Sequence, residues 1–260
     1  MNGYDVVAQC MKAEGVTWMP CFPASPLIEA VAKIGIRPIV FRQERGGINA
    51  ADGYSRQSSG NQFGVFASQA GPGVENSFGG IAQAWGDSVP ILYLPGGHGT
   101  SKYDVAPNFS ATKNYGGITK LALSIDNPSS ITRQMRRAYH ALKNGRPGPV
   151  IVEMHGDAMA QEIPGGAEGY NPTSAMKTAP SRSDVKDAVT ALLNASTPVL
   201  WAGQGVLYAE ATDELVELAE LTKIPVLTTL AGKSSFPENP PLALGTGASS
   251  ATLMAHHFLK

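Results

Sequence analysis

Cysteine and charge are both scarce in this 260-residue sequence. Its two cysteines, Cys10 and Cys21, are too few for a disulfide framework, so we expect a reducing compartment, the cytoplasm. Charged residues make up 16% of the chain, the net charge is -1, and no basic run exceeds Arg136-Arg137, which argues against nucleic-acid or membrane partners. Residues 1–15 contain neither a basic leader nor a long apolar run, so we expect no signal peptide and no spanning helix.

Glycine and proline are frequent by comparison, with 29 and 19 residues, and they occur singly at turn positions. Between them, apolar periodicity alternates between two kinds of segment. Strand-like segments cover residues 16–22, 37–42, 62–68, 89–96 and 148–154, and helix-like segments cover residues 4–14, 27–33, 44–58, 73–85 and 129–143. Because the strands are apolar throughout and separated by helices, the pattern predicts an α/β fold with a doubly wound parallel sheet. Ligand loops are then expected at the carboxyl ends of the strands.

The same pattern predicts the domain organisation. Residues 1–157 form the first α/β domain, and residues 158–181, rich in Gly, Pro, Ser and Thr, are predicted as a linker. Residues 182–260 begin a second α/β domain. Its predicted elements are helices at 183–193, 210–221 and 254–260 and strands at 198–203 and 224–230. Two strands cannot cover their own sheet, so this second domain is predicted to be incomplete.

The densest feature for chemistry is the segment RQERGGINAADGYSR at residues 42–56. Glu44 is placed where a buried strand ends and a helix begins, among small residues that allow a flat ligand to approach closely. Taken alone, a glutamate in the first turn of a helix is explained by the helix macrodipole. Two further segments, SQAGPGVEN at 68–76 and GRPGPVIVEMHGD at 145–157, are each weak signals as well.

In this order and spacing, the segments resemble the thiamine-diphosphate enzyme family that includes acetolactate synthase, benzoylformate decarboxylase, glyoxylate carboligase and oxalyl-CoA decarboxylase. The family's "RHE…GAA…AADGYAR", "TSGPG" and "GRPGPV…D" segments match residues 42–56, 69–73 and 145–157. Its central-domain segments match residues 198–205 and 224–245. The resemblance runs from about residue 3 to residue 250. It implies a pyrimidine-binding domain at 1–157, followed by the first part of the central domain.

The resemblance also implies a mechanism and a set of site residues. Glu44 would be the catalytic residue, a carboxyl group bonded to N1′ of the cofactor's aminopyrimidine. The resemblance implies a lyase or a carboligase (transferase) that acts on a 2-oxo acid and decarboxylates it. The cofactor would supply the carbanion. The residues implied for cofactor binding are Pro23, Glu44, Gly71, Pro72, Gly73 and Asn76.

Several positions depart from the acetolactate-synthase pattern and leave the substrate open. Phe109 matches the family's "FQE.D" segment, whereas Ser110 to Thr112 do not, and Pro23-Ala24-Ser25 stands where "PGG" is common. The candidates for the substrate channel are Ala24, Ser25, His98, Phe109 and Lys120. For His98 a solvent-facing loop histidine is the commoner case, and for Lys120 an ordinary surface lysine explains the residue at least as well.

The family holds Mg²⁺ and the diphosphate through a "GDG…N" segment of a third domain. Gly86-Asp87-Ser88 comes too early to match it, and no histidine has metal-ligand spacing, so we expect no metal site in this chain. Diphosphate binding is assigned to a second polypeptide or to a missing C-terminal part. Since the sequence starts with methionine, a natural split subunit in a homo- or hetero-oligomer is favoured.

Two alternatives to this interpretation remain. A non-catalytic regulatory or assembly subunit of the same fold is allowed by the departures at Ser110 to Thr112. An unrelated nucleotide-binding enzyme is disfavoured, because neither G-x-G-x-x-G after the first strand nor G-x-x-x-x-G-K-[ST] occurs. The residues do not decide whether a flavin (FAD) or an adenine nucleotide binds the central domain.

Overall fold

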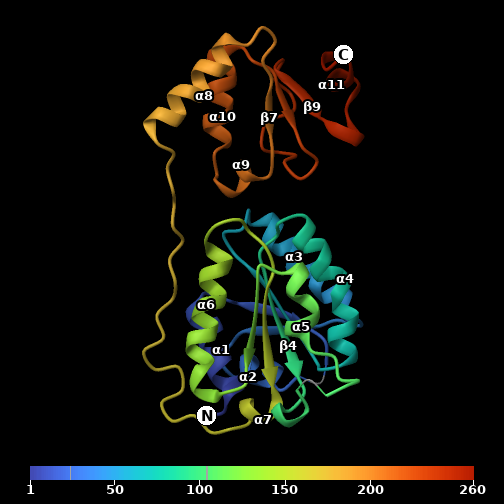
Figure 1. The fold of residues 1–260 in the computed structure, drawn as a ribbon, viewed down its shortest axis with the longest axis vertical. Coiled ribbons are helices and arrows are strands. Elements are labelled where there is room, and N and C mark those ends of the chain that lie inside the picture. Colours follow the sequence, from blue (N-terminus) through green and yellow to red (C-terminus); the bar gives the residue numbers. More distant parts are fainter. Residues whose placement is uncertain (24, 104) are drawn as a thin grey trace. The chain divides into compact units, whose positions relative to one another are not determined.

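The computed structural model describes residues 1–23, 25–103 and 105–260. They form two compact units, Met1–Met176 and Lys177–Lys260, each of which is described by itself. In Figure 1 the first unit is coloured from blue to yellow and the second from orange to red.

The first unit is built on a six-stranded sheet in the order β2-β1-β3-β4-β6-β5, with every neighbouring pair parallel. Its strands are β1 (Trp18–Cys21), β2 (Arg37–Val40), β3 (Gly64–Ser68), β4 (Ile91–Gly97), β5 (Leu121–Ile125) and β6 (Val150–His155). Its α-helices are α1 (Gly3–Ala13), α2 (Leu27–Lys33), α3 (Glu44–Gln57), α4 (Pro72–Gly86), α5 (Ala111–Tyr115), α6 (Ile131–Lys143) and α7 (Gly156–Met159). Single 3-10 turns are η1 (Thr100–Lys102), η2 (Gly116–Ile118) and η3 (Pro128–Ser130).

Helices cover both faces of this sheet, as the sequence predicts for a doubly wound fold. Helices α1, α2 and α6 share one apolar core with the sheet, and α3, α4 and α5 share the other. Along β3 the side chains alternate between the two cores, with Val65 and Ala67 in the first and Phe66 in the second. This alternation explains why the strand is apolar at every position.

Most of the predicted elements of the first unit are present, with slightly different ends. Helix α1 starts with a capping box, in which the Asn2 side chain accepts from the backbone N–H of Asp5 and the Asp5 carboxylate accepts from that of Asn2. Strand β5 was missed by the sequence analysis. It lies at the sheet edge and is only partly buried, so its sequence, LALSI, lacks the uninterrupted apolar run that marks a central strand.

Residues 158–176 belong to the first unit, although they lie within the predicted linker 158–181. Their anchor is Glu14, whose side chain is fully buried and forms an ion pair with Lys143 at 2.6 Å. The Tyr170 hydroxyl and the Thr173 N–H donate to Glu14 Oε1 at 2.8 and 3.2 Å, and Lys143 Nζ donates to the Thr173 carbonyl at 2.7 Å. We call residues 160–176 the strap, because they are bound along α1 and α6.

The second unit contains a parallel sheet in the order β7-β8-β9. Its strands are β7 (Leu200–Ala202), β8 (Val226–Thr228) and β9 (Ala243–Thr246). Its helices are α8 (Arg182–Asn194), α9 (Gly205–Tyr208), α10 (Thr212–Thr222) and α11 (Leu253–Phe258), with a 3-10 turn η4 (Ala248–Ser250).

The prediction of two strands for this unit was wrong, because β9 is a third. Strand β9 has a glycine, Gly245, in a left-handed conformation (φ +80°) and a register shift against β8. A short strand interrupted in this way carries no clear period of two. The closing helix is present as α11.

Among the described residues, the structure contains no helix that is both long enough and apolar enough to cross a membrane.

Candidate active site

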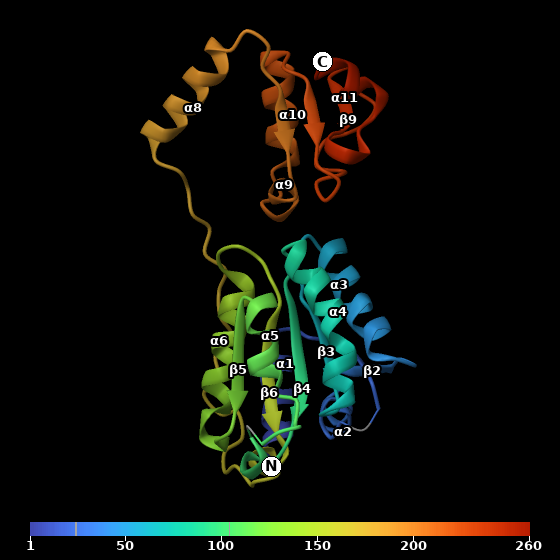
Figure 2. The ribbon, with the colours of Figure 1, turned by 45° about the vertical axis from the view of Figure 1, so that its right-hand side comes forward.

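The carboxyl ends of the parallel strands bring the candidate residues together at one end of the first sheet. We call this end the carboxyl edge, and the end where the strands begin the amino edge. Figure 2 shows the arrowheads of β4, β5 and β6 pointing to this edge. Glu44 follows the end of β2, Gly71 follows β3, His98 follows β4, and His155 ends β6. Open α/β sheets bind ligands at this edge, next to the strand where the order reverses. Here that strand is β1, which has β2 on one side and β3 on the other.

Glu44 is the first residue of α3, and its side chain is buried, with 3% of the residue exposed. The preceding Gln43 is extended (φ -156°, ψ 155°), so the chain turns from β2 into the helix at this point. The Asn76 side-chain amide donates to Glu44 Oε2 at 3.3 Å. The helix N-terminus favours the negative charge of the carboxylate. A buried carboxyl group with a donor from α4 beside it can exchange a proton away from bulk water.

The turn before α4 places glycines against Glu44. Gly71 has a positive φ (+66°) and caps α4, with its carbonyl accepting from the N–H groups of Val74 and Glu75. A Cβ atom on Gly73 would lie 3.4 Å from Glu44 Oε1, in contact with the carboxylate, and 2.7 Å from Gln69 Cγ, so a side chain here would force Gln69 to move. A Cβ on Gly71 would meet nothing within 4 Å. The turn therefore has free space on one side, where a ligand can lie.

Tyr93 of β4 lies beneath this edge, fully buried in the core shared with α3 and α4. Its hydroxyl is 2.7 Å from Ser68 Oγ at the end of β3. Burial raises the pKa of Tyr93, and the nearby carboxylates Glu44 and Glu153 raise it further. Tyr93 is therefore a neutral hydrogen-bonding group between two acidic residues.

Glu153 was not identified from the sequence, yet it is the second buried acid near this edge, with 1% exposed. From β6 its carboxylate accepts from the backbone N–H groups of Ala111 and Thr112, at 3.2 and 3.0 Å, and from Thr112 Oγ1 at 2.9 Å. Ser110 Oγ donates to it at 3.4 Å. Glu153 thus caps α5 from a neighbouring strand. The signal available in the sequence was a single acidic residue inside the apolar run VIVEM.

His98 and Phe109 line one small cavity of about 10 Å³, which is close to the smallest volume that holds a water molecule. The residues that complete its lining are Lys102, Tyr103, Asn108, Ser110, Glu153 and His155. His155 was also missed as a member of this group. Its Nδ1 lies 2.5 Å from the His98 carbonyl oxygen and its Nε2 lies 2.8 Å from Ser124 Oγ, so the imidazole connects β6 to the loop after β4 and to β5.

Asp157, matched to the last residue of a family segment, holds the same loop from the other side. Its Oδ2 accepts from the backbone N–H and the hydroxyl of Thr100, at 2.9 and 2.5 Å. These hydrogen bonds keep the pKa of Asp157 below its usual value. The role visible for Asp157 is therefore to position η1, the turn that follows His98.

Among the remaining described candidates, Lys120 and Ser25 take part in other contacts. Lys120 precedes β5, at the opposite edge of the sheet, where its Nζ donates to the carbonyls of Ala141 and Asn144 near the end of α6, and burial lowers its pKa. Pro23 is exposed, and Ser25 is buried where its carbonyl accepts from Ile28 N–H at the start of α2. Ala24 lies outside the described residues.

Among the described residues, no three His, Cys, Asp or Glu side chains gather as metal ligands.

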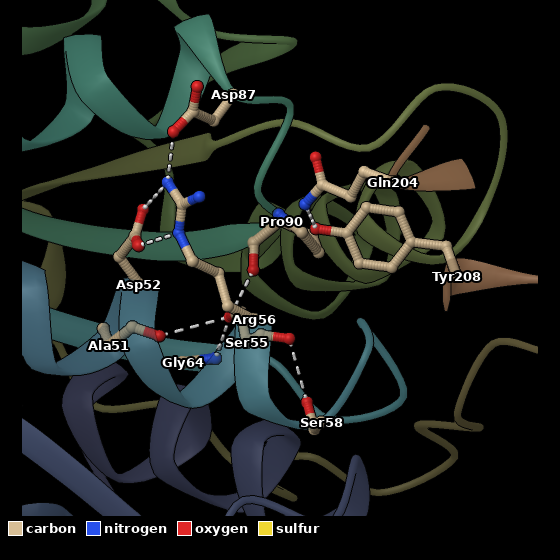
Figure 3. A network of polar contacts seen from close by, with 10 residues as sticks. All are labelled: Ala51, Asp52, Ser55, Arg56, Ser58, Gly64, Asp87, Pro90, Gln204 and Tyr208. Carbon is tan, nitrogen blue, oxygen red and sulfur yellow. Dashed lines mark hydrogen bonds and ion pairs between the residues drawn. The ribbon is translucent and has the colours of Figure 1, made fainter. Parts of the chain in front are cut away.

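The second half of the Glu44 segment, AADGYSR, is structural rather than part of the group around Glu44. Arg56 pairs with Asp52 at 2.5 Å and with Asp87, after the end of α4, at 2.7 Å (Figure 3). These two carboxylates raise the pKa of Arg56 against the lowering effect of burial. Ser55 Oγ donates to the Pro90 carbonyl at 2.6 Å and accepts from Gly64 N–H at 2.9 Å, which joins α3 to the strands β3 and β4.

Comparison with known proteins gives matches over both units. The family model for "Thiamine pyrophosphate enzyme, N-terminal TPP binding domain" matches residues 1–118. The model for "Thiamine pyrophosphate enzyme, central domain" matches residues 185–260.

Several curated proteins are similar to nearly the whole chain. A probable acetolactate synthase large subunit of Methanocaldococcus jannaschii is 34% identical over 99% of this chain and 45% of its own length. The glyoxylate carboligase of Escherichia coli O157:H7 is 32% identical, over 94% of this chain and 42% of its own. The chloroplastic acetolactate synthase of Arabidopsis thaliana is 32% identical over 98% and 39%. The chain therefore spans less than half the length of these relatives.

Proposed function

Because the chain belongs to the thiamine pyrophosphate enzyme family, we propose that it is the part of a 2-oxo-acid carboligase or decarboxylase that activates the cofactor through Glu44. The observation that carries the proposal is the burial of the Glu44 carboxylate, 3% exposed, against the glycine turn at Gly71 to Gly73. A flat heterocycle fits this arrangement because Gly71 carries no side chain and a Cβ there would meet nothing within 4 Å.

The residues present fit the pyrimidine half of thiamine diphosphate. Glu44 provides a carboxyl group, and the Asn76 side-chain amide donates a hydrogen bond to one of its oxygens at 3.3 Å. The free space beside Gly71 is where a ring can lie. When bound, the cofactor supplies the nucleophilic carbon that attacks the 2-oxo acid and the electron sink for decarboxylation. Gly71, Pro72 and Gly73 would support the ring, and Pro23 would lie on the same edge after β1.

The chain's own contribution to the chemistry is proton transfer, in a site that the diphosphate-binding part would close to water. Glu44 exchanges a proton between its carboxyl oxygen and the ring nitrogen N1′. Burial makes this exchange effective, since no solvent competes for the carboxylate. Tyr93 and Ser68 fix the packing beneath Glu44 through their 2.7 Å hydrogen bond.

The diphosphate and its Mg²⁺ belong, in this proposal, to a segment outside the described residues, on a second chain or a further domain. Magnesium needs several oxygen ligands around the phosphates, and the described residues supply no such cluster. The active unit would thus be a homo- or hetero-oligomer or a longer chain, and the site would close only when the diphosphate-binding part covers Glu44.

The substrate class follows from the relatives. Two of their names, acetolactate synthase and glyoxylate carboligase, describe carboligation, and glyoxylate is the shortest 2-oxo acid. We extend 2-oxo-acid carboligation to this chain, with His98 and Phe109 as candidates for contact with the substrate because they lie together at the same edge; the cavity of about 10 Å³ that they line is too small to hold the substrate itself. Lys120, at the opposite edge, has no part in this proposal.

The test is to combine the chain with the protein encoded by the neighbouring gene, if that protein carries a diphosphate-binding segment. Cofactor-dependent consumption of pyruvate and glyoxylate is then measured for wild type, Glu44→Gln and the matched control Glu75→Gln, an exposed glutamate of α4. We expect Glu44→Gln to lower turnover at least about 100-fold, because general acid–base catalysis contributes roughly that factor. The control should keep wild-type turnover.

Binding of thiamine diphosphate to the same assembly is measured by calorimetry. Full turnover in Glu44→Gln would contradict the role of Glu44. Binding without turnover in the wild-type assembly would favour the alternative, a non-catalytic regulatory or assembly subunit of the same fold.

A further inference from the structure

A second cavity lies in the first unit, away from Glu44, between α6 and the strap. Its volume is about 600 Å³, within the range of small-molecule sites. The residues that line this α6 groove are Leu121, Arg133, Arg136, Arg137, His140, Ala141, Pro172, Thr173 and Ser174. Leu121 begins β5, so the groove reaches the amino edge of the sheet, whereas Glu44 lies at the carboxyl edge. The groove is therefore separate from the candidate active site.

The strap forms one wall of the groove, and hydrogen bonds hold that wall in place. Thr173 is fixed through its N–H to the buried Glu14, at 3.2 Å, and through its carbonyl to Lys143, at 2.7 Å. Asn144 donates to the Ser174 carbonyl at 3.2 Å. The Thr173 hydroxyl is buried and has no hydrogen-bond partner in the described part of the chain. The wall is thus preformed, and it contains a polar group that lacks a partner.

The opposite wall is strongly cationic. Arg133, Arg136, Arg137 and His140 are exposed and recur at spacings of three and four residues, which places them on one side of α6. Helix α6 contains no acidic residue, and no ion pair involves these arginines among the described residues. Like charges at these spacings repel one another. An anion in the groove would remove this repulsion.

The hydrogen bonds of the arginines leave donors available for a ligand. Arg136 donates from Nη1 to the Asn171 carbonyl at 2.9 Å, which draws it toward the strap, and Arg137 donates to Gln134 Oε1 at 2.9 Å. Each guanidinium has five N–H donors, so most of them remain unused in these contacts. The Arg133 side chain makes no hydrogen bond or ion pair with another described residue. Guanidinium groups bind phosphate oxygens in pairs, with good geometry.

We propose that the α6 groove binds a small organic phosphate. The phosphate contacts Arg133, Arg136 and Arg137, and the organic part packs on Leu121, Ala141 and Pro172. The mixed lining supports this class of ligand: the cations account for the phosphate, and the apolar residues account for a carbon skeleton that an inorganic ion lacks. This proposal is independent of the chemistry assigned to Glu44.

The experiment is calorimetric titration of the 260-residue chain with uridine diphosphate, phenyl phosphate and inorganic pyrophosphate at low salt. At least one organic phosphate should bind with a dissociation constant below about 1 mM, and about tenfold more tightly than pyrophosphate. The substitutions Arg133→Gln and Arg137→Gln should each weaken that binding about tenfold, as expected for a lost charged hydrogen bond. Arg182→Gln changes an exposed arginine of α8 outside the groove and is the matched control. It should bind like wild type.

Thermal melting of each variant without ligand separates loss of binding from loss of folding, and the exposed arginines should melt within about 2 °C of wild type. Failure of both organic phosphates to bind would overturn the proposal. So would equal weakening by the control substitution, since the binding would then be general charge attraction. Pyrophosphate binding as tightly as the organic phosphates would refute the organic ligand and leave an adventitious ion only.

Discussion

The two units of this chain have the same alternation of strands and helices but very different interiors. In the first unit, helices cover both faces of six strands and two apolar cores are complete. In the second, three strands share one small core, and no residue of α8 is buried. Three apolar residues on one side of α8, Val185, Val189 and Leu193, are 45%, 45% and 68% exposed.

The comparison shows that an alternation of strands and helices in the sequence does not by itself produce a complete apolar core. An amphipathic helix is stabilised in a protein mainly by the surface against which it packs. The first unit provides such a surface for each of its long helices, and the carboxyl edge of its sheet carries the candidate active site. Five substitutions, with their controls, test this difference, from the largest expected effect to the smallest.

Gly64→Ala should have the largest effect, because a Cβ at this position would lie 2.0 Å from the carbonyl oxygen of Ala51. Backbone atoms of α3 and β3 would have to separate, and we expect a loss of about 5 kcal/mol in unfolding free energy. Denaturant unfolding followed by circular dichroism measures it. The control is Gly53→Ala, at an exposed position inside α3 where an added Cβ meets nothing within 4 Å. This control should stabilise the protein by about 0.5 to 1 kcal/mol.

Phe66→Ala and Phe236→Ala test whether the two units unfold separately. Phe66 is buried in a core of the first unit, and its removal should lower the stability of that unit by about 4 kcal/mol. Phe236, 3% exposed, lies in the small core of the second unit. Hydrogen exchange resolved along the chain should show each substitution affecting one unit only. Equal loss of protection in both units would mean that they form one cooperative structure.

Glu14→Gln tests the strap. The substitution keeps the size of the side chain and removes the charge that Lys143, Tyr170 and Thr173 contact, so the first unit should lose about 2 kcal/mol. Limited proteolysis should then cut within residues 160–176, which we expect to be protected in wild type because these hydrogen bonds hold them. If the cutting pattern does not change, the strap is held mainly by its other contacts.

Leu193→Gln should have the smallest effect, because the Leu193 side chain is 68% exposed on α8. We expect a change within about 0.5 kcal/mol, as for surface substitutions in general. The measurement is the unfolding midpoint of the second unit by hydrogen exchange. A loss of 2 kcal/mol or more would show that α8 has a packing partner in solution, and the contrast between the units would weaken.

Much of the first unit could be predicted because its central strands are apolar on both faces and its helices end at recognisable residues. Strand β5 could not, because an edge strand buries only part of its surface. The role of Glu153 could not be predicted either, since the segment that it caps lies 41 residues or more away in the sequence. Lys120 illustrates the opposite difficulty: its sequence position resembled a channel residue, whereas the start of β5 places it at the far edge.

The sequence alone determined the alternation of the central strands and long helices of the first unit, the family resemblance, and the choice of Glu44 as the candidate catalytic residue. These depend on local patterns, such as an acidic residue between a strand and a glycine-rich helix start. Only the tertiary structure decided that Asn76 and Gly73 face Glu44, that the strap belongs to the first unit, and that the arginines of α6 share a groove with it. Contacts between distant segments depend on how the sheet is covered, and no local pattern of residues encodes them.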